Sequence, residues 1–400
     1  MASGFLRWAN CCVKFTPMEL PKDAKMTKLR SFLRFSWAFR AGLLSIVLAG
    51  CGEIDEQKAG EHLKDNTRNF RWKLVTAWPP NTPINHETVV QFAEDVRTMS
   101  SGRLDIQVFA GGELIPALQS FDAVSQGSVQ MAHAASYFWA GKIPAAQFMT
   151  AVPFGMTREK VVAWLYGSDG LELWRELYEP FGIIPFPMGN TGIQMGGWFN
   201  KKIETISDLQ GLKMRIPGLG GKVLAKAGGN PVLLAPGEIY TALERGTIDA
   251  TEWVGPLLDV RFGLNRAAKY YYYPGWHEPG SQLELLVNAN AWAELGPDLQ
   301  AILEAAAALS ASRMNALTDA ENARVLNELY AKGQTEILKF PEEVMEVLEG
   351  LTDDVLAEES EGDPVFARVL KSYQSFRSQM SHYAGVTTEA YKESFSYPEE

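Results

Sequence analysis

A short pattern occurs twice in this chain: the end of a helix, a glycine, and an apolar strand. The first copy is Ala123-Val-Ser-Gln-Gly127-Ser-Val-Gln-Met-Ala, and the second is Ala242-Leu-Glu-Arg-Gly246-Thr-Ile-Asp-Ala. Each glycine fits the left-handed position that ends a helix. The recurrence predicts two similar α/β domains, since such helix-to-strand joints build layered α/β folds. Chance is the alternative, because these turns are common in α/β proteins.

The first domain is predicted from alternating strand and helix patterns. Apolar alternation predicts strands, and apolar residues at helical spacing predict the helices between them. The expected strands are residues 72–77, 103–109 and 129–134, and the expected helices are residues 87–99 and about 115–125. This order favours a mostly parallel sheet covered by helices.

The C-terminal part is predicted to be helical. From Pro297 apolar residues fall on one face, and the pattern continues as one helix to about Ala331. Two further amphipathic helices are expected after Pro341 and Asp363. A helix this long either braces both domains or packs against a second subunit. The expected division is a first α/β domain over residues 72–185 to which later chain segments return, a second α/β domain over 186–290, and a helical region over 291–400.

The first fifty residues resemble a bacterial signal peptide. They are basic, and residues 41–50 are apolar but shorter than the roughly 20 residues that cross a bilayer. Their end, Leu48-Ala-Gly-Cys51, resembles a lipobox, so we expect Cys51 to be lipidated and residues 51–71 to be a tether. A buried cysteine is the alternative. Met26 also begins a normal signal sequence, so residues 1–25 could precede the true start.

Charge and cysteine content exclude several classes of protein. The first fifty residues carry a net charge of +6 within a total of −11, so the remainder carries −17. An acidic chain without a basic block is not expected to bind nucleic acid or an anionic membrane surface. With Cys51 lipidated, and with Cys11 and Cys12 in the leader, no thiol remains for a disulfide or a zinc cluster.

Common catalytic motifs are absent from the sequence. It has no Gly-x-Ser-x-Gly elbow, no His-Glu-x-x-His and no Walker loop. The segment Gly218-Leu-Gly-Gly221 lacks the spacing of a dinucleotide fingerprint, and we expect a mobile turn after a strand there. The five histidines are scattered, and we expect each of them, His277 included, to be a surface or packing residue. The sequence therefore favours a binding protein over an enzyme.

Two charged side chains follow apolar strands. Glu252 and Trp253 come after the strand of the second repeat, and Arg215 ends the segment Leu212-Lys-Met-Arg215. Ionised groups in such places are costly unless each has a partner, a ligand or a metal. Together they predict a closed polar site for a small anion. Gln194 lies in the glycine-rich segment 190–197, which we expect to be a strand whose backbone can approach a ligand; an amide bonded to neighbouring backbone is the alternative.

With these residues, the chain resembles the substrate-binding subunit of tripartite ATP-independent periplasmic (TRAP) transporters over about residues 72–395. The likeness rests on the lipobox, residues 211–218, residues 235–250 and the long helical tail. Glu252-Trp253 and Gly275-Trp-His-Glu278-Pro-Gly resemble the branch that binds 2-oxo acids or lactate through a metal ion. The resemblance implies an α/β, two-domain, periplasmic-binding-protein-like fold with a hinge and long C-terminal helices.

The resemblance also implies roles for single residues. Arg215 matches the arginine that holds the ligand carboxylate, and Gln194, Glu252 and the Trp253 carbonyl match positions that hold a cation. Such an oxygen shell fits Na⁺ or Ca²⁺ better than zinc. Two assignments stay open. They are Glu278 or Gln282 as a further contact, and Tyr137 or Phe138 as the cap on the ligand from the first domain.

The function implied is that of a lipid-anchored periplasmic receptor, not an enzyme. It would capture a small 2-oxo or 2-hydroxy monocarboxylate with Na⁺ or Ca²⁺ and deliver it to the membrane subunits of a TRAP transporter, with a homodimer as one arrangement. A receptor of the same fold for a larger organic acid or an amino acid is the first alternative. A periplasmic enzyme acting on small organic acids is the second.

Overall fold

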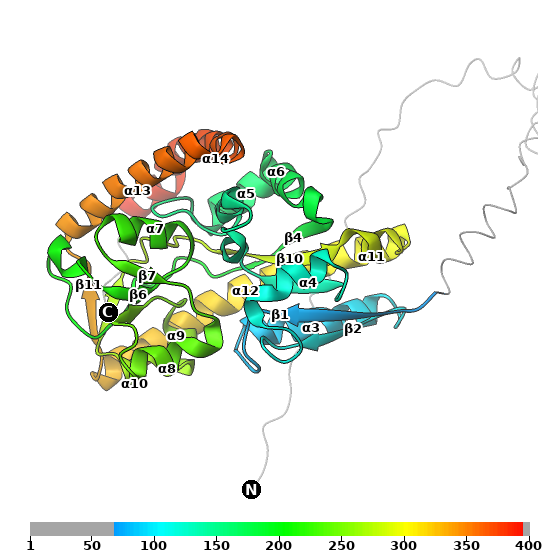
Figure 1. Cartoon of the computed structure of the whole chain (residues 1–400), viewed down its shortest axis with the longest axis horizontal. Helices are drawn as coiled ribbons and strands as arrows, with labels where there is room; N and C mark the ends of the chain where they lie inside the picture. Colours follow the sequence, from blue (N-terminus) through cyan, green and yellow to red (C-terminus); the bar gives the residue numbers. More distant parts are fainter. Residues whose placement is uncertain (1–67, 395–400) are drawn as a thin grey trace, which may run out of the picture. The chain divides into compact units, whose positions relative to one another are not determined.

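Two mixed β-sheets organise the chain in the computed structural model, which describes residues 68–394 (Figure 1). The first lobe is the five-stranded sheet with its helices, and the second lobe is the six-stranded sheet with its helices. Both belong to one unit, residues 65–400. The predicted signal sequence, Cys51 and most of the predicted tether lie outside the described residues. Within residues 68–394, no helix is both long enough and apolar enough to span a membrane.

The first sheet combines an early parallel part with two strands from later in the chain. In spatial order its strands are β2 (Leu104–Phe109), β1 (Phe70–Thr76), β3 (Met131–Ala134), β10 (Gln282–Asn288) and β4 (Ile183–Asn190). β1 is parallel to β2 and β3, as the alternating pattern predicts, whereas β10 is antiparallel to both β3 and β4. Residue 186, where we expected the second domain to begin, lies in β4 of this first sheet.

Helices and short helical segments accompany the strands of the first lobe. They are α3 (Asn85–Met99), α4 (Ser120–Ser125), α5 (Arg158–Gly167), α6 (Gly170–Tyr178) and α11 (Ala289–Ala293), with short segments η1 (Ala117–Gln119), η2 (Ser136–Trp139), η3 (Pro144–Met149) and η4 (Glu179–Phe181). α3 buries Val89, Phe92 and Val96 at helical spacing against Trp72 and Leu74 of β1. Apolar burial on one face thus fixes this helix on the sheet.

The second sheet is built from short strands. In spatial order they are β11 (Glu336–Lys339), β9 (Tyr270–Tyr273), β5 (Gly197–Phe199), β8 (Ala250–Thr251), β6 (Lys213–Arg215) and β7 (Asn230–Val232). Its helices are α7 (Gly218–Lys226), α8 (Ile239–Glu244), α9 (Pro256–Arg261) and α10 (Leu264–Ala267), with η5 (Ile206–Leu209) and η6 (Pro236–Glu238). The glycine segment at 218–221 begins α7, so the expectation of a mobile turn there was wrong.

The recurring helix-to-strand joint is confirmed in both lobes. Gly127 follows α4 with φ 72° and leads to β3, and Gly246 follows α8 with φ 69° and leads to β8. Both values lie in the left-handed region that glycine adopts without steric cost. The two lobes therefore share the local element that the sequence repeats.

The helix expected from Pro297 to about Ala331 is confirmed as α12 (Pro297–Lys332), shown in yellow in Figure 1. Leu299 and Leu303 pack in the core of the first lobe. Farther along, Asn315 Oδ1 accepts a hydrogen bond from Asn190 N (3.1 Å), and Asn322 Oδ1 accepts one from Leu257 N (2.9 Å) in the second lobe. α12 thus contacts the first lobe, the end of β4 and the second lobe in turn.

The remaining helices form a second connection between the lobes. They are α13 (Glu342–Gly362), α14 (Pro364–Ala384), η7 (Gly385–Glu389) and α15 (Ala390–Ser394). Glu358 of α13 pairs with Lys226 of α7 (2.5 Å) in the second lobe. Tyr373 of α14 packs on Phe148 in the first lobe, and its hydroxyl accepts a hydrogen bond from Met156 N (2.7 Å). Helices after Pro341 and Asp363 are thus confirmed.

A buried carboxyl lies in the core of the first lobe. Glu284 of β10 accepts hydrogen bonds from Trp139 Nε1 (2.6 Å) and Tyr178 Oη (2.9 Å). Burial disfavours the charged form and raises the pKa of Glu284 to about 8. In the unfolded chain the pKa lies near 4.5, so the native state binds the extra proton between about pH 4.5 and 8.

We predict that Glu284→Gln flattens the pH dependence of stability. In the native protein, protonated Glu284 contributes to the free energy of unfolding. This contribution is fully present below about pH 4.5 and is lost as the pH rises through the folded pKa near 8. A neutral glutamine removes this loss, which amounts to at most about 1.4 kcal/mol per pH unit. Urea unfolding between pH 5 and 8 measures it, with exposed Glu294→Gln as control. Equal slopes for the variant and the native protein contradict the prediction.

Candidate functional site

Arg215 and Glu252 form a fully buried ion pair at the ends of two neighbouring strands. β6 is parallel to β8 with Arg215 opposite Thr251, so both strands end at the same edge of the second sheet. Glu252 N donates to Arg215 O (3.3 Å), and Arg215 Nη1 donates to Glu252 Oε1. Both side chains are 0% exposed. The sequence predicted that a guanidinium and a carboxylate each leave a buried strand, and the structure adds that the two strands are neighbours.

Two segments that pass between the sheets carry further polar side chains to this pair. Residues 191–196 connect β4 to β5, and residues 274–281 connect β9 to β10. Their backbones are bonded to each other through Gly275 N to Gln194 O (2.9 Å), Gln194 N to Glu278 O (3.2 Å) and Thr191 N to Ser281 O (3.0 Å). We call them the crossing segments. They join the lobes and also supply site residues.

Gln194 lies in the first crossing segment, not in a strand as we expected. Nearby Gly197, with φ +113°, brings the chain against the backbone of Thr251, where an added Cβ would lie 2.6 Å from the carbonyl oxygen. The glycine-rich sequence therefore permits a close approach between protein backbones and sets Gln194 beside Glu252. A glycine-rich strand was expected here, but the chain pairs with the other crossing segment instead.

Gln194 and Glu278 are bonded to each other within the site. Gln194 Nε2 donates to Glu278 Oε2 (2.8 Å) and Thr191 Oγ1 (3.1 Å), and Ser281 Oγ also donates to Glu278 Oε2. Burial and the neighbouring Glu252 raise the pKa of Glu278 to about 7. Gln282, the other candidate, has its amide bonded to Gly189 O (2.7 Å). The structure therefore places Glu278, rather than Gln282, with Gln194.

His277 is a site residue that sequence reasoning missed. We expected a packing or surface histidine, but its Nε2 lies 3.6 Å from Glu252 Oε2, and the residue is only 2% exposed. Ligand atoms of Glu252, His277 and Glu278 lie within 4.8 Å of one another. The sequence offered one signal, the position of His277 directly before Glu278 in the Gly275–Gly280 segment. Its burial depends on distant parts of the chain.

Several polar atoms converge here without a hydrogen-bond partner in the described part of the chain. They are Gln194 Oε1, Arg215 Nε and Nη2, Glu252 Oε2, Trp253 Nε1, both ring nitrogens of His277, and Glu278 Oε1. Buried polar groups in proteins are almost always paired, because an unpaired one costs about 1–3 kcal/mol. Eight such atoms in one place indicate a site for polar ligands.

Aromatic side chains of both lobes enclose the polar cluster. Tyr137 and Phe138 of η2 line a cavity of ≈ 290 Å³ with Ile216, the residue after Arg215. Burial, together with the charges of Glu278 and Glu252, raises the pKa of Tyr137 well above its usual value. Trp253 lies 5.5 Å from the Arg215 guanidinium carbon. Tyr137 and Phe138 therefore both bring first-lobe rings against the second lobe beside Ile216.

Trp78 is a second residue near the site that sequence reasoning missed. It follows β1 in the first lobe and meets Trp253 of the second lobe edge to face, with ring centroids 6.3 Å apart. Its Nε1 donates to His133 Nδ1 (2.7 Å), while His133 Nε2 lies 2.9 Å from Met188 O. Burial lowers the pKa of His133 to about 4, so the ring is neutral and can accept this bond. The network fixes the first-lobe wall opposite Trp253.

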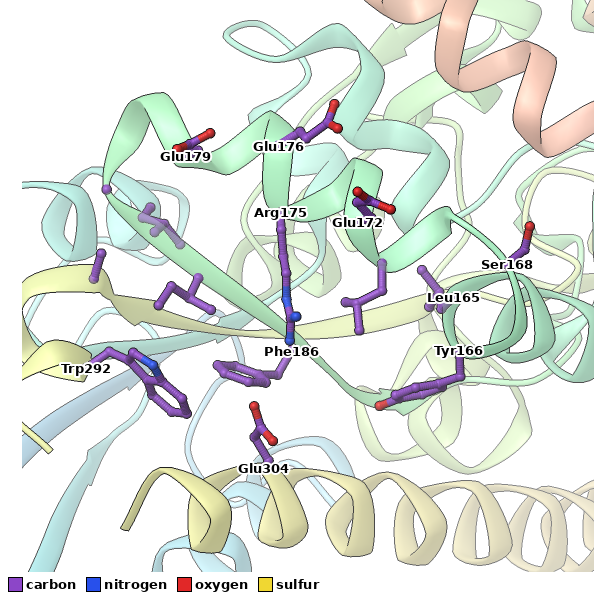
Figure 2. Close-up of a pocket in the computed structure, with 15 residues that line it drawn as sticks. Leu165, Tyr166, Ser168, Glu172, Arg175, Glu176, Glu179, Phe186, Trp292 and Glu304 are labelled. Atoms are coloured by element: carbon purple, nitrogen blue, oxygen red, sulfur yellow. The ribbon is translucent and has the colours of Figure 1, made fainter. Parts of the chain in front are cut away.

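A larger pocket of ≈ 800 Å³ lies elsewhere, between α6, β4 and α12 (Figure 2). Arg175 extends over the Phe186 ring, 5.9 Å from its centroid. The exposed carboxylates around this pocket belong to Glu172, Glu176, Glu179 and Glu304. An acidic rim repels an anion, and none of the predicted site residues lines it. The polar cluster at Arg215, which contains the predicted site residues, is the better candidate.

A two-lobed α/β fold whose crossing segments meet at a buried polar cluster defines a solute-binding protein. The family model of bacterial extracellular solute-binding proteins, family 7, matches residues 74–361. The chain belongs to this family.

Individual relatives are similar over most of their length. A monocarboxylate 2-oxoacid-binding periplasmic protein of Nostoc sp. is 45% identical over 326 residues, which cover 81% of this chain and 88% of that protein. A TRAP periplasmic solute-binding protein from Pseudoalteromonas atlantica, crystallised with sodium and pyruvate, is 44% identical with a TM-score of 0.80. Its counterpart from Colwellia psychrerythraea, with calcium and pyruvate, is 43% identical with a TM-score of 0.80. Each structure covers 82% of this chain and is itself covered over 100% of its length.

We predict that the ion pair is strongly coupled in the ligand-free, metal-free protein. Arg215→Met leaves Glu252 buried without a counter-charge and should cost about 3–5 kcal/mol of unfolding free energy. Adding Glu252→Gln should recover part of that loss. A double-mutant cycle by urea unfolding measures the coupling energy.

The matched control is the exposed pair of Arg368 and Glu176, whose N to O distance is 2.5 Å. The same substitutions there should give a coupling below about 1 kcal/mol, because water screens the charges. Equal coupling energies at the buried and exposed pairs contradict the electrostatic description of the site.

Proposed function

We propose that this protein is an extracytoplasmic receptor of a TRAP transporter that captures a small 2-oxo or 2-hydroxy monocarboxylate together with a metal ion. The observation that carries the proposal is the arrangement of unpartnered atoms around the Arg215 and Glu252 pair. Unpartnered donors on Arg215 and unpartnered acceptors on Glu252, Gln194 and Glu278 lie within one buried cluster. This combination suits an organic anion bound beside a cation.

Arg215 suits the carboxylate of the ligand. Nη1 is bonded to Glu252, whereas Nε and Nη2 have no partner among the described residues. These two nitrogens form one edge of the planar guanidinium and can donate two parallel hydrogen bonds to a carboxylate. The ion pair with Glu252 therefore also orients the free edge of Arg215.

The oxygen atoms opposite Arg215 suit a cation. Glu252 Oε2, Gln194 Oε1 and Glu278 Oε1 are buried and unpartnered, and amide and carboxylate oxygens are the ligands that Na⁺ and Ca²⁺ prefer. The backbone carbonyl of Trp253 is the further ligand expected from the family resemblance. The bound cation supplies positive charge for the anion's carbonyl or hydroxyl oxygen, and the two similar structures with pyruvate hold sodium and calcium.

The crossing segments suit a closing motion of the lobes. They hydrogen-bond to each other and carry Gln194 and Glu278, so a change in the angle between the lobes moves site residues directly. Tyr137 of the first lobe and Trp253 of the second lobe cover opposite sides of the site. A ligand that contacts both lobes stabilises the closed arrangement by its contacts there.

The cellular setting follows from the N-terminal sequence and the family. We propose export by the signal sequence of residues 1–50, lipid attachment at Cys51, and delivery of the ligand to the membrane subunits of the transporter. Lipidation would keep the receptor near its transporter without a membrane-spanning helix. A homodimer through the C-terminal helices remains a second arrangement, which light scattering on residues 72–400 would detect.

We predict that Arg215→Lys weakens pyruvate binding by at least about tenfold. Lysine keeps the charge beside Glu252 but loses the planar two-pronged edge. Isothermal titration calorimetry of pyruvate in the presence of CaCl₂ measures the affinity. Arg324→Lys, an exposed substitution on α12, is the matched control and should bind as the native protein does.

The same samples separate the receptor from an enzyme. Chromatography after the titration should recover pyruvate unchanged and in full. Loss of pyruvate with time would favour the enzymatic alternative, and unaltered affinity in Arg215→Lys would remove Arg215 from the carboxylate site.

A further inference from the structure

The imidazole of His277 lies beside the proposed cation site and forms no hydrogen bond with the described residues. Both ring nitrogens are buried and unpartnered. A neutral imidazole has one donor and one acceptor, and leaving both unpaired in a protein interior is unfavourable. A surface or packing role does not account for a ring that is 2% exposed and adjoins two carboxylates.

Hydrogen bonding to Glu252 does not explain the position of the ring. His277 Nε2 lies 3.6 Å from Glu252 Oε2, which is longer than an N to O hydrogen bond of about 2.7–3.2 Å. Two atoms that share one ion lie farther apart than hydrogen-bonded atoms. Ligands at about 2.1 Å from a metal and at tetrahedral angles are roughly 3.4 Å from each other. The separation fits two ligands of one cation.

The backbone holds the ring in this place from several sides. Trp276 O accepts a hydrogen bond from Phe154 N (2.8 Å), and Glu278 O accepts one from Gln194 N (3.2 Å). On another side, α7 approaches the ring closely at Gly220. A Cβ added to this glycine would lie only 2.9 Å from His277 Cβ. These contacts on both sides of residue 277 restrict where its side chain can go.

From this geometry we infer that His277 Nε2 is a direct ligand of the site's cation, together with carboxylate oxygens of Glu252 and Glu278. The inference deepens the proposed function, since it concerns the same cation site. A nitrogen ligand changes the range of ions. Imidazole suits divalent transition metals such as Fe²⁺, Ni²⁺ and Zn²⁺, whereas carboxylate and carbonyl oxygens suit Ca²⁺ and Mn²⁺. A mixed shell of carboxylate oxygens and one imidazole can hold a first-row divalent metal that also accepts oxygen ligands. The site therefore binds Mn²⁺ as well as Ca²⁺.

Electron spin echo measurements on Mn²⁺ test the inference, because they detect nitrogen bonded to the metal. The full protein is freed of metal with chelator and loaded with one equivalent of Mn²⁺, with and without pyruvate. We expect ¹⁴N modulation from a coordinated imidazole. Protein labelled with ¹⁵N-histidine should show the corresponding ¹⁵N pattern, which tests histidine ligation without any substitution.

Variants then assign the nitrogen to His277. His277→Gln should lose the histidine modulation and bind Mn²⁺ at least about tenfold more weakly, with a smaller change for Ca²⁺. His382→Gln, at an exposed position on α14, is the matched control and should keep both the signal and the affinity. Modulation that survives in His277→Gln would overturn the inference.

Two other results would also overturn it: bound Mn²⁺ without histidine modulation, or no binding of Mn²⁺ at the site. Calorimetry with pyruvate and Ca²⁺ on the native protein keeps this question apart from the proposed function. Pyruvate binding with Ca²⁺ but without nitrogen ligation would refute only the role of His277. Nitrogen-ligated Mn²⁺ without pyruvate binding would refute only the proposed ligand.

Discussion

The buried pair of Arg215 and Glu252 is the interaction on which the binding site depends. Burying a single charge in this interior would carry a large desolvation cost. The attraction between the two opposite charges offsets that cost. The pair uses one guanidinium nitrogen and one carboxylate oxygen, which leaves Arg215 Nε and Nη2 and Glu252 Oε2 unpartnered among the described residues. The same contact therefore stabilises the charges and, in the proposed site, leaves a donor edge and an acceptor available to a ligand.

The fold provides this pair with partners from distant parts of the chain. Strand ends of the second sheet present Arg215 and Glu252, and the crossing segments add Gln194, His277 and Glu278. Since those segments also join the lobes, the site and the hinge are one structural unit. Helix α12 contacts both lobes and bonds to Asn190, the last residue of β4 before the first crossing segment, so it supports the region where the lobes join.

Local sequence patterns predicted the elements that depend on local physics. The glycine-capped joints, the helix between Pro297 and Lys332, and the strand ends at Arg215 and Glu252 follow from periodicity, capping and the cost of buried charge. The assignment of β4 to the first sheet did not follow. β4 pairs with β10 about a hundred residues later, and no local pattern encodes such a pairing.

The candidate site could be predicted only in part, because local patterns do not encode contacts between distant segments of the chain. Arg215 and Glu252 were recognisable because each charge directly follows an apolar strand. Gln194 was placed in a strand, because the backbone pairing of the two crossing segments is visible only in three dimensions. His277 was missed, since only the approach of α7 and the neighbouring carboxylates distinguish it from the other histidines. Side chains that function through tertiary packing leave little trace in local sequence.

The central claim is that a guanidinium and a metal ion together neutralise one organic acid between two lobes. Its most direct test is the affinity for pyruvate, measured by calorimetry over a series of Ca²⁺ concentrations in sodium-free buffer. If one cation binds with each anion, a plot of the logarithm of the apparent affinity against the logarithm of the Ca²⁺ concentration should have a slope of about 1. The slope should fall to zero once the cation site is full. An affinity that stays the same when both calcium and sodium are removed would contradict the account.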